Sequence, residues 1–327
     1  MNRRRFLVQA SALVLPSLIA EAQPAGGVHR IGLLIAQSQA NYPAHFARAV
    51  DQGLRELGYI EGRNLVIERR FADGNQERMP SLALELVGLK VDIIVAATDV
   101  GALAAKNASS GIPIVFVSGG DPVGIGLINS LSRPGGNVTG FASFTDVIIG
   151  KQLELLREVI PRLGTLAVMR SSNAAAAAKQ LAAAREASAA LNLKVSLHDL
   201  RSEADLENVF AAIKRERPEA LQVIPSIATF AHRKRIADFA AAQRLPAIYG
   251  LAEYVEAGGL ISYGVNFADN WRRAAGYVDK ILKGAKPSDL PVQQPTQFEL
   301  AVNLGTAKAL GVVIPPSVLV RADRVIQ

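Results

Sequence analysis

Residues 30–35 of the chain are RIGLLI, and residues 43–58 are PAHFARAVDQGLRELG. The first stretch is a short, almost unbroken apolar run, which is typical of a parallel strand buried on both faces. In the second stretch apolar residues recur at helical spacing from Phe46 to Leu57. Gly58 then follows at the position where glycine commonly ends a helix. Together the two stretches predict a strand followed by a helix.

The same strand–helix unit recurs in two series along the chain, and the second series begins near residue 147. Such an alternation favours a parallel sheet covered by helices on both faces, so we expect an α/β protein in which each series forms a doubly wound parallel sheet. The predicted strands are 65–70, 92–97, 114–118, 166–169, 194–199, 221–224 and 247–249, and the predicted helices are 76–89, 100–108, 147–160, 174–191, 203–217 and 229–243.

A stretch rich in Gly and Pro, residues 121–140, separates the two series. Its composition predicts turns, and we interpret its end as the first crossing between lobes, with Gly135-Gly136-Asn137 as a hinge turn. The chain then offers a strand from Gly258 and a linker at 286–291. The predicted first lobe is 28–140 plus about 250–284, and the predicted second lobe is 141–249 plus about 285–327.

The chain begins MNRRRFLVQASALVLPSLIAEA, which has the features of a secretory signal peptide. The apolar run is shorter than the roughly 20 residues of a membrane-spanning helix. Arg3-Arg4 resembles a twin-arginine signal. We therefore expect residues 1–22 to direct export to the periplasm by the Tat pathway, with cleavage near Ala22. The alternative is an uncleaved N-terminal anchor.

The remaining chain is too long for the usual single core, which also favours two domains. Removing residues 1–22 lowers the formal net charge from +7 to +5, and no block of basic residues with interleaved aromatics follows. A nucleic-acid partner is therefore not expected. The sequence contains no cysteine, which excludes disulfides and thiolate metal sites.

The sequence lacks the motifs of common catalytic sites. There is no Gly-x-Ser-x-Gly, no His-Glu-x-x-His and no phosphate-binding loop. His29, His45, His198 and His232 do not have the spacing of metal ligands. Gly124-x-Gly126 is only a fragment of a dinucleotide-binding motif. We therefore expect no enzyme, no cofactor and no metal.

Short polar segments follow several predicted strands. In doubly wound sheets, ligands bind at the carboxyl ends of the strands, and helix N-termini there can hold an anion. For any one segment the alternative is a simple helix cap. Because the segments recur in both series, we expect a binding cleft between two lobes. The segments are 37–38, 98–99, 118–121, 171–173, 225–226 and Tyr249.

Four parts of the sequence, residues 53–64 with Glu68, 121–124, 132–140 and 151–156, closely resemble the ABC transporter substrate-binding protein family that includes TrpX-like tryptophan- and tyrosine-binding lipoproteins. The RPGGNVTG string at 133–140 is specific. The resemblance covers nearly the whole chain after the leader. It implies the type I periplasmic-binding-protein fold, with two Rossmann-like lobes that have parallel sheets, three hinge crossings and a ligand in the cleft.

That resemblance implies capture of a small ligand, an amino acid or small carboxylate, and its delivery to an ABC permease. The expected polar contacts come from both lobes. Asp99 or Asp121 would pair with a ligand amine, although Asp121 before Pro122 is also typical of a turn. Three aromatic residues would stack on the ligand, with core packing as the alternative. The predicted site comprises Ser38, Thr98, Asp99, Asp121, Ser143, Phe144, Asn173, Ser226, Tyr249 and Tyr263.

A periplasmic sensor of the same fold, signalling to a membrane partner, is the alternative function. A DNA-binding regulator of this fold would need a helix-turn-helix where this chain carries its leader. The expected partners are therefore a small molecule and a permease, and we expect a monomer.

Overall fold

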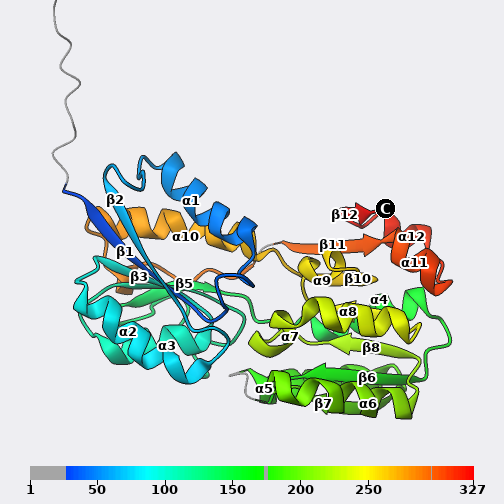
Figure 1. Ribbon diagram of the computed structural model, residues 1–327. Helices are drawn as coiled ribbons and strands as arrows, with labels where there is room; N and C mark the ends of the chain where they lie inside the picture. Colours follow the sequence, from blue (N-terminus) through cyan, green and yellow to red (C-terminus); the bar gives the residue numbers. More distant parts are fainter. Residues whose placement is uncertain (1–26, 173–175, 296) are drawn as a thin grey trace, which may run out of the picture.

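The chain forms two α/β lobes that lie side by side (Figure 1). The computed structural model describes residues 27–172, 176–295 and 297–327. The predicted leader, residues 1–22, lies outside the described residues. Mostly parallel sheets form the centre of both lobes, as the alternating pattern predicted.

The first lobe is built on a five-stranded parallel sheet in the order β2-β1-β3-β4-β5. Alternate residues of its strands face opposite helix layers: Ile93 and Val95 pack in one cluster with α1 and α10, whereas Ile94 packs in another with α2 and α3. Both faces are therefore apolar, which explains the unbroken apolar runs. The elements are β1 (His29–Ile35), α1 (Ala44–Glu56), β2 (Leu65–Phe71), η1 (Gln76–Arg78), α2 (Met79–Gly88), β3 (Ile93–Ala97), α3 (Asp99–Ala108), β4 (Ile114–Ser118), β5 (Val138–Ala142) and α10 (Phe267–Leu282).

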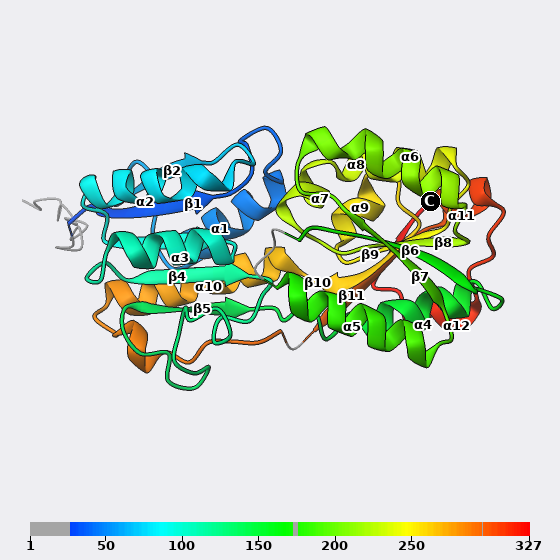
Figure 2. The same ribbon diagram turned by 90° about the horizontal axis from the view of Figure 1, so that it is seen from below.

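The second lobe contains a seven-stranded sheet in the order β12-β11-β10-β9-β8-β6-β7, in which only the β10–β11 pair is antiparallel among the described pairs. Helices α6 and α8 cover one face, and α4, α5 and α12 cover the other (Figure 2). The elements are α4 (Ile149–Val159), β6 (Thr165–Arg170), α5 (Ala177–Ala190), β7 (Lys194–Asp199), η2 (Glu203–Asp205), α6 (Leu206–Glu216), β8 (Ala220–Val223), α7 (Ile227–Ala231), α8 (Arg233–Ala242), β9 (Ala247–Tyr249), α9 (Ala252–Glu256), β10 (Ile261–Val265), β11 (Phe298–Asn303), α11 (Leu304–Leu310), α12 (Pro316–Leu319) and β12 (Arg324–Ile326).

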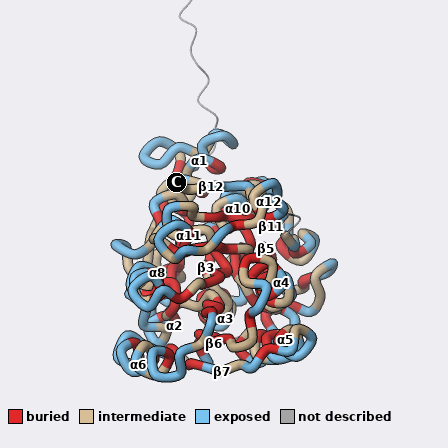
Figure 3. The backbone as a smooth tube through the Cα atoms, turned by 90° about the vertical axis from the view of Figure 1, so that its right-hand side faces the viewer, coloured by how far each residue is buried: buried red, intermediate tan, exposed pale blue. Residues whose placement is uncertain are grey.

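Buried residues concentrate on the central strands, and the helices expose their outer faces (Figure 3). Helix α1 illustrates the pattern, because Phe46, Val50 and Leu54 are buried. Its Gly53 allows α10 to approach closely, since a Cβ atom there would lie 2.7 Å from the carbonyl oxygen of Arg272. The pairing of α1 with α10 therefore joins segments that are far apart in the sequence.

The structure divides the second half of the chain differently from our expectation. Residues 250–284 were expected in the first lobe, but β10 lies between β9 and β11 in the second sheet, and only α10 returns to the first lobe. The segment after α10, with η3 (Pro287–Asp289), also stays with the first lobe. There Gln293 pairs with Phe141 of β5. The prediction was wrong because pairing between strands, which the linear pattern does not show, decides lobe membership.

The stretch 133–140 is also placed differently. Gly135-Gly136-Asn137 was predicted as a hinge turn, but it immediately precedes β5, at the end of the sheet opposite the cleft. The Asn137 amide donates to the carbonyl oxygens of Ser109 (2.9 Å) and Ile112 (2.7 Å), which fixes the entry to β5. The first crossing follows β5, after Ala142. Strand β5 was missed because its glycine suggested a turn.

Gly140 lies within β5 with φ +150°, and a Cβ atom there would be 2.1 Å from the carbonyl oxygen of Phe116 on β4. We predict that Gly140→Ala destabilises the protein by about 2–5 kcal/mol, because a methyl group would force the two strands apart. Chemical denaturation measures this change.

Gly88→Ala is the matched control, since nothing lies within 4 Å of a Cβ atom at the end of α2. It should be neutral or stabilising by up to about 1 kcal/mol. Equal unfolding midpoints for Gly140→Ala and the wild type would contradict the close approach of β5 to β4.

Candidate functional site: the pocket between the lobes

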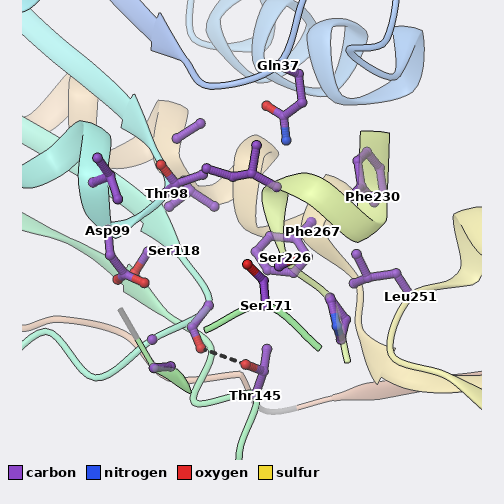
Figure 4. Close-up of a pocket in the computed structure, with 18 of the residues that line it drawn as sticks. Gln37, Thr98, Asp99, Ser118, Thr145, Ser171, Ser226, Phe230, Leu251 and Phe267 are labelled. Carbon is purple, nitrogen blue, oxygen red and sulfur yellow. Dashed lines mark hydrogen bonds between the residues drawn. The ribbon is translucent and has the colours of Figure 1, made fainter. Parts of the chain in front are cut away.

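A pocket of about 150 Å3 lies between the two lobes at the carboxyl ends of their strands (Figure 4). Loops after β1, β3 and β4 form its first-lobe wall. Loops after β6, β8 and β9 form the opposite wall. Parallel strands deliver their carboxyl ends to one edge of a sheet, so both sheets direct polar loop residues to the same space.

One side of the pocket is polar. Asp99 and Ser118 lie there, and the Ser171 hydroxyl comes from the second lobe. Asp99 is the only carboxylate, and no Lys, Arg or His occurs among the described lining residues. Its Oδ1 is fully buried and makes no hydrogen bond in the described part of the chain. This side therefore offers a negative charge that lacks a cationic partner.

Burial raises the pKa of Asp99 above its ordinary value, and the nearby negative charge of Asp121 adds to the effect. The Ser118 hydroxyl partly offsets the shift. The pocket thus penalises the ionised carboxylate unless a positive group enters. A ligand ammonium group would supply that positive charge.

The other side of the pocket is aromatic. Tyr42, Phe46, Phe230, Phe267 and Trp271 line it. The ring of Phe46 lies 6.4 Å from that of Phe230 across the lobe boundary and 6.4 Å from that of Phe267. These separations lie within or near the range of favourable ring pairs, and the faces enclose a space suited to an apolar group.

Direct contacts hold the two lobes together around the pocket. His45 of α1 lies 2.8 Å from Glu253 of α9, measured between Nε2 and Oε1. Asp121 of the first lobe forms an ion pair with Lys179 of α5. The Gln180 amide, also on α5, donates to the Thr145 hydroxyl over 3.2 Å. The lobes are therefore in contact on more than one side of the cleft.

Three residues of the predicted site line the pocket: Thr98, Asp99 and Ser226. Thr98 caps α3 with φ +74°, and its hydroxyl accepts from the Gly101 amide (3.3 Å). Ser226 caps α7 and accepts from the Thr229 amide (3.1 Å). Capping and pocket lining thus coincide, because these helices begin at the cleft.

The other predicted polar residues are placed elsewhere. Ser38 closes a turn in which its carbonyl accepts from the Tyr42 amide (2.9 Å). Asp121 Oδ1 accepts from the Val123 and Gly124 amides (3.1 and 3.0 Å), so Asp121 shapes a turn, which was the alternative to ligand binding. Ser143 is buried and accepts from the Asn270 amide (3.2 Å). The described residues that line the pocket do not include these three, and Asn173 lies outside the described residues.

The predicted aromatic contacts belong to the core. Tyr249 is fully buried and stacks on Tyr254 at 5.0 Å between ring centroids. Tyr263 packs 5.7 Å from Phe298, and Phe144 packs in a first-lobe cluster. Each of them faces a helix layer or another core group, so none reaches the pocket.

Most of the loops that line the pocket were predicted from the sequence, but several of the lining residues were not among the predicted site residues. Gln37, Ser118 and Ser171 lie in segments that were identified after strands. The aromatic residues Phe230, Phe267 and Trp271 come from helices, where their spacing resembles ordinary core packing. Phe267 and Trp271 reach the cleft only because α10 begins at the boundary between the lobes.

In residues 27–172, 176–295 and 297–327, no group of three or more His, Cys, Asp or Glu side chains is arranged to hold a metal ion. The helices in these same ranges include none with the length and apolar character needed to span a membrane.

Because the buried Asp99 carboxylate lacks a counter-charge, the ligand-free protein should gain stability from Asp99→Asn. A raised carboxyl pKa in the folded state means that stability falls as pH rises from the unfolded-state pKa through the folded-state pKa. The cost is fully present at pH values above the folded-state pKa. We therefore predict that Asp99→Asn raises the melting temperature at pH 7 by a few degrees, and that the gain disappears toward pH 3.

Asp238→Asn is the control, because Asp238 is an exposed residue of α8 whose pair with Lys234 lies on the surface. It should change stability by less than about 0.5 kcal/mol. A lower melting temperature for Asp99→Asn at pH 7 would mean that its carboxylate stabilises the empty pocket.

Comparisons with solved structures support the fold assignment. A conserved domain protein from Vibrio cholerae O1 biovar eltor matches with a TM-score of 0.85 and 26% identity, covering 91% of this chain and 99% of that one. The ABC domain from Streptococcus pneumonia in complex with L-Trp matches with a TM-score of 0.84, 24% identity and the same coverages. The ligand-free, open structure of a substrate-binding protein with adhesive properties from Clostridium difficile matches with a TM-score of 0.68 and 26% identity, covering 92% of this chain and 100% of that one.

Among curated proteins, a tyrosine-binding protein from Clostridioides difficile (strain R20291) is 26% identical over 259 residues, which are 79% of this chain and 74% of that protein. The family model described as "ABC transporter substrate binding protein" matches residues 44–326, which include nearly every element of both lobes. The chain therefore belongs to the ABC transporter substrate-binding protein family.

Proposed function

We propose that the protein binds an amino acid with an aromatic side chain in the pocket between its lobes and delivers it to an ABC permease. The observation that carries this proposal is the division of the pocket into a side with one unpaired carboxylate and an aromatic side. An α-amino acid carries an ammonium group next to its side chain, and this pocket complements both. The tyrosine-binding relative and the neighbour that holds L-Trp support the same ligand class.

In the proposed complex Asp99 pairs with the ligand ammonium group. The hydroxyls of Thr98, Ser118, Ser171 and Ser226 supply neutral hydrogen bonds to the head group. The rings of Phe46, Phe230 and Trp271 surround the side chain.

A ligand that touches both lobes favours the closed arrangement, because its contacts to both walls exist only when the lobes meet. The pairs His45–Glu253 and Asp121–Lys179 join the lobes in the same arrangement. The structure resembles the L-Trp complex more than the open, ligand-free relative, which supports a closed form. The permease would recognise this closed form.

Members of this family typically act outside the cytoplasm with a permease, and the family is not one of enzymes. For this chain we propose export to the periplasm by the Tat pathway, removal of residues 1–22 and action as a monomer. The basic residues 3–5 followed by a short apolar run in the leader support this route.

The proposal predicts that aromatic L-amino acids raise the melting temperature of protein that has been unfolded and refolded to remove any bound ligand. At 100 times the dissociation constant a ligand adds about 2.7 kcal/mol, which is a shift of a few degrees. Calorimetric titration gives the dissociation constant. Asp99→Asn should lower the affinity at least tenfold, whereas Asp238→Asn should leave it unchanged. Absence of binding by every amino acid would overturn the proposal.

The same pairing predicts a pH dependence of binding. The ammonium group requires an ionised Asp99, whose pKa is raised by burial, so affinity should fall as the pH is lowered through that pKa. Titrations between pH 4 and pH 8 measure this dependence. In Asp99→Asn the affinity should vary much less over the same range, and an equal slope in both proteins would assign the titration to another group.

A further inference from the structure

The aromatic side of the pocket contains two polar groups that lack a partner. The side-chain Oε1 of Gln37 and the hydroxyl of Tyr42 are buried and make no hydrogen bond in the part of the chain that the structure describes. Both residues line the pocket and both lie in the loop between β1 and α1. Buried polar groups are usually paired, so two unpaired ones in a binding pocket need an explanation.

The surroundings of Tyr42 leave its hydroxyl neutral. Its ring meets those of Phe46 (6.0 Å), Phe71 (6.2 Å) and Trp271 (6.3 Å) edge-on. Burial, followed by the negative charge of Asp51, raises the pKa of Tyr42 above its ordinary value. The hydroxyl can therefore both donate and accept a hydrogen bond at any physiological pH.

Gln37 belongs to the same first-lobe wall as Asp99 and Ser118, but it lies apart from them, at the other end of the pocket in the view of Figure 4. If a ligand's ammonium group binds Asp99, the Gln37 side of the pocket is where the end of its side chain arrives. A wholly apolar side chain cannot form a hydrogen bond with a carboxamide or a hydroxyl. They suit a side chain whose outer end carries one polar group, such as a phenol hydroxyl or an indole N–H.

We propose that Gln37 and Tyr42 are specificity-determining residues that hydrogen-bond a polar group at the tip of the ligand's aromatic side chain. This inference rests on the proposed function, because it assumes an amino acid in the pocket. A site built to hydrogen-bond such a group rejects the analogue that lacks it, since the buried partners then stay unpaired. The pocket thereby prefers tyrosine or tryptophan over phenylalanine, which has the same shape as tyrosine without the hydroxyl.

The test compares dissociation constants for two nearly isosteric pairs, L-tyrosine with L-phenylalanine and L-tryptophan with 1-naphthyl-L-alanine. In the wild-type protein the donor-bearing member of at least one pair should bind about tenfold more tightly or better. Gln37→Met and Tyr42→Phe keep the side-chain size and remove the polar groups. In each variant the ratio of the two dissociation constants within a pair should move toward one, mainly because the donor-bearing ligand binds more weakly.

Ser171→Ala is the matched control, because Ser171 lines the polar side of the pocket. It should change the affinity for both members of a pair by the same factor and keep their ratio. Circular dichroism and thermal unfolding establish that every variant is folded before its affinities are compared.

Two results would overturn the inference while leaving amino-acid capture intact. One is equal affinity of the wild-type protein for both members of each pair. The other is a preference that persists in both Gln37→Met and Tyr42→Phe, which would assign it to other residues. If the wild-type protein binds no amino acid at all, the proposed function fails, and this inference fails with it.

Discussion

The structure depends on one constraint, which is that neighbouring parallel strands in each lobe direct their carboxyl ends to the space between the lobes. The two sheets contain ten described strand pairings, and all of them are parallel except the pairing of β10 with β11. A parallel strand must be followed by a return through a helix, so the helices α3 and α7, which follow β3 and β8, begin near the cleft. Polar residues that cap those helices therefore also line the pocket, as Thr98 and Ser226 do.

Unpaired polar groups in the pocket lower the stability of the ligand-free protein, and they are available to hydrogen-bond a ligand. Asp99 Oδ1, Gln37 Oε1 and Tyr42 OH are buried without hydrogen-bond partners among the described residues. Each such group costs about 1–3 kcal/mol when it is left unpaired, and the protein recovers that free energy when a complementary ligand arrives.

Segment α10 links the fold to the site. It follows β10 of the second sheet, crosses to the first lobe and packs on α1, while its first two turns carry Phe267 and Trp271 to the pocket. Asn266 caps this helix by accepting from the Asp269 amide (3.0 Å), so the crossing residue is also the start of the helix. A change in the angle between the lobes would therefore move these two rings relative to Phe230 on the opposite wall.

The sequence by itself determined the α/β class, the two lobes and the loops that meet at the cleft, because buried parallel strands and amphipathic helices have distinct periodicities. The tertiary structure alone decided that β10 joins the second sheet, that 133–140 leads into β5, and that Tyr249 lies in the core while Phe230 and Trp271 face the pocket. These outcomes depend on contacts between residues far apart in the chain. An aromatic residue at helical spacing has the same local pattern in a core and at a cleft, and only the packing of the second lobe against the first distinguishes the two.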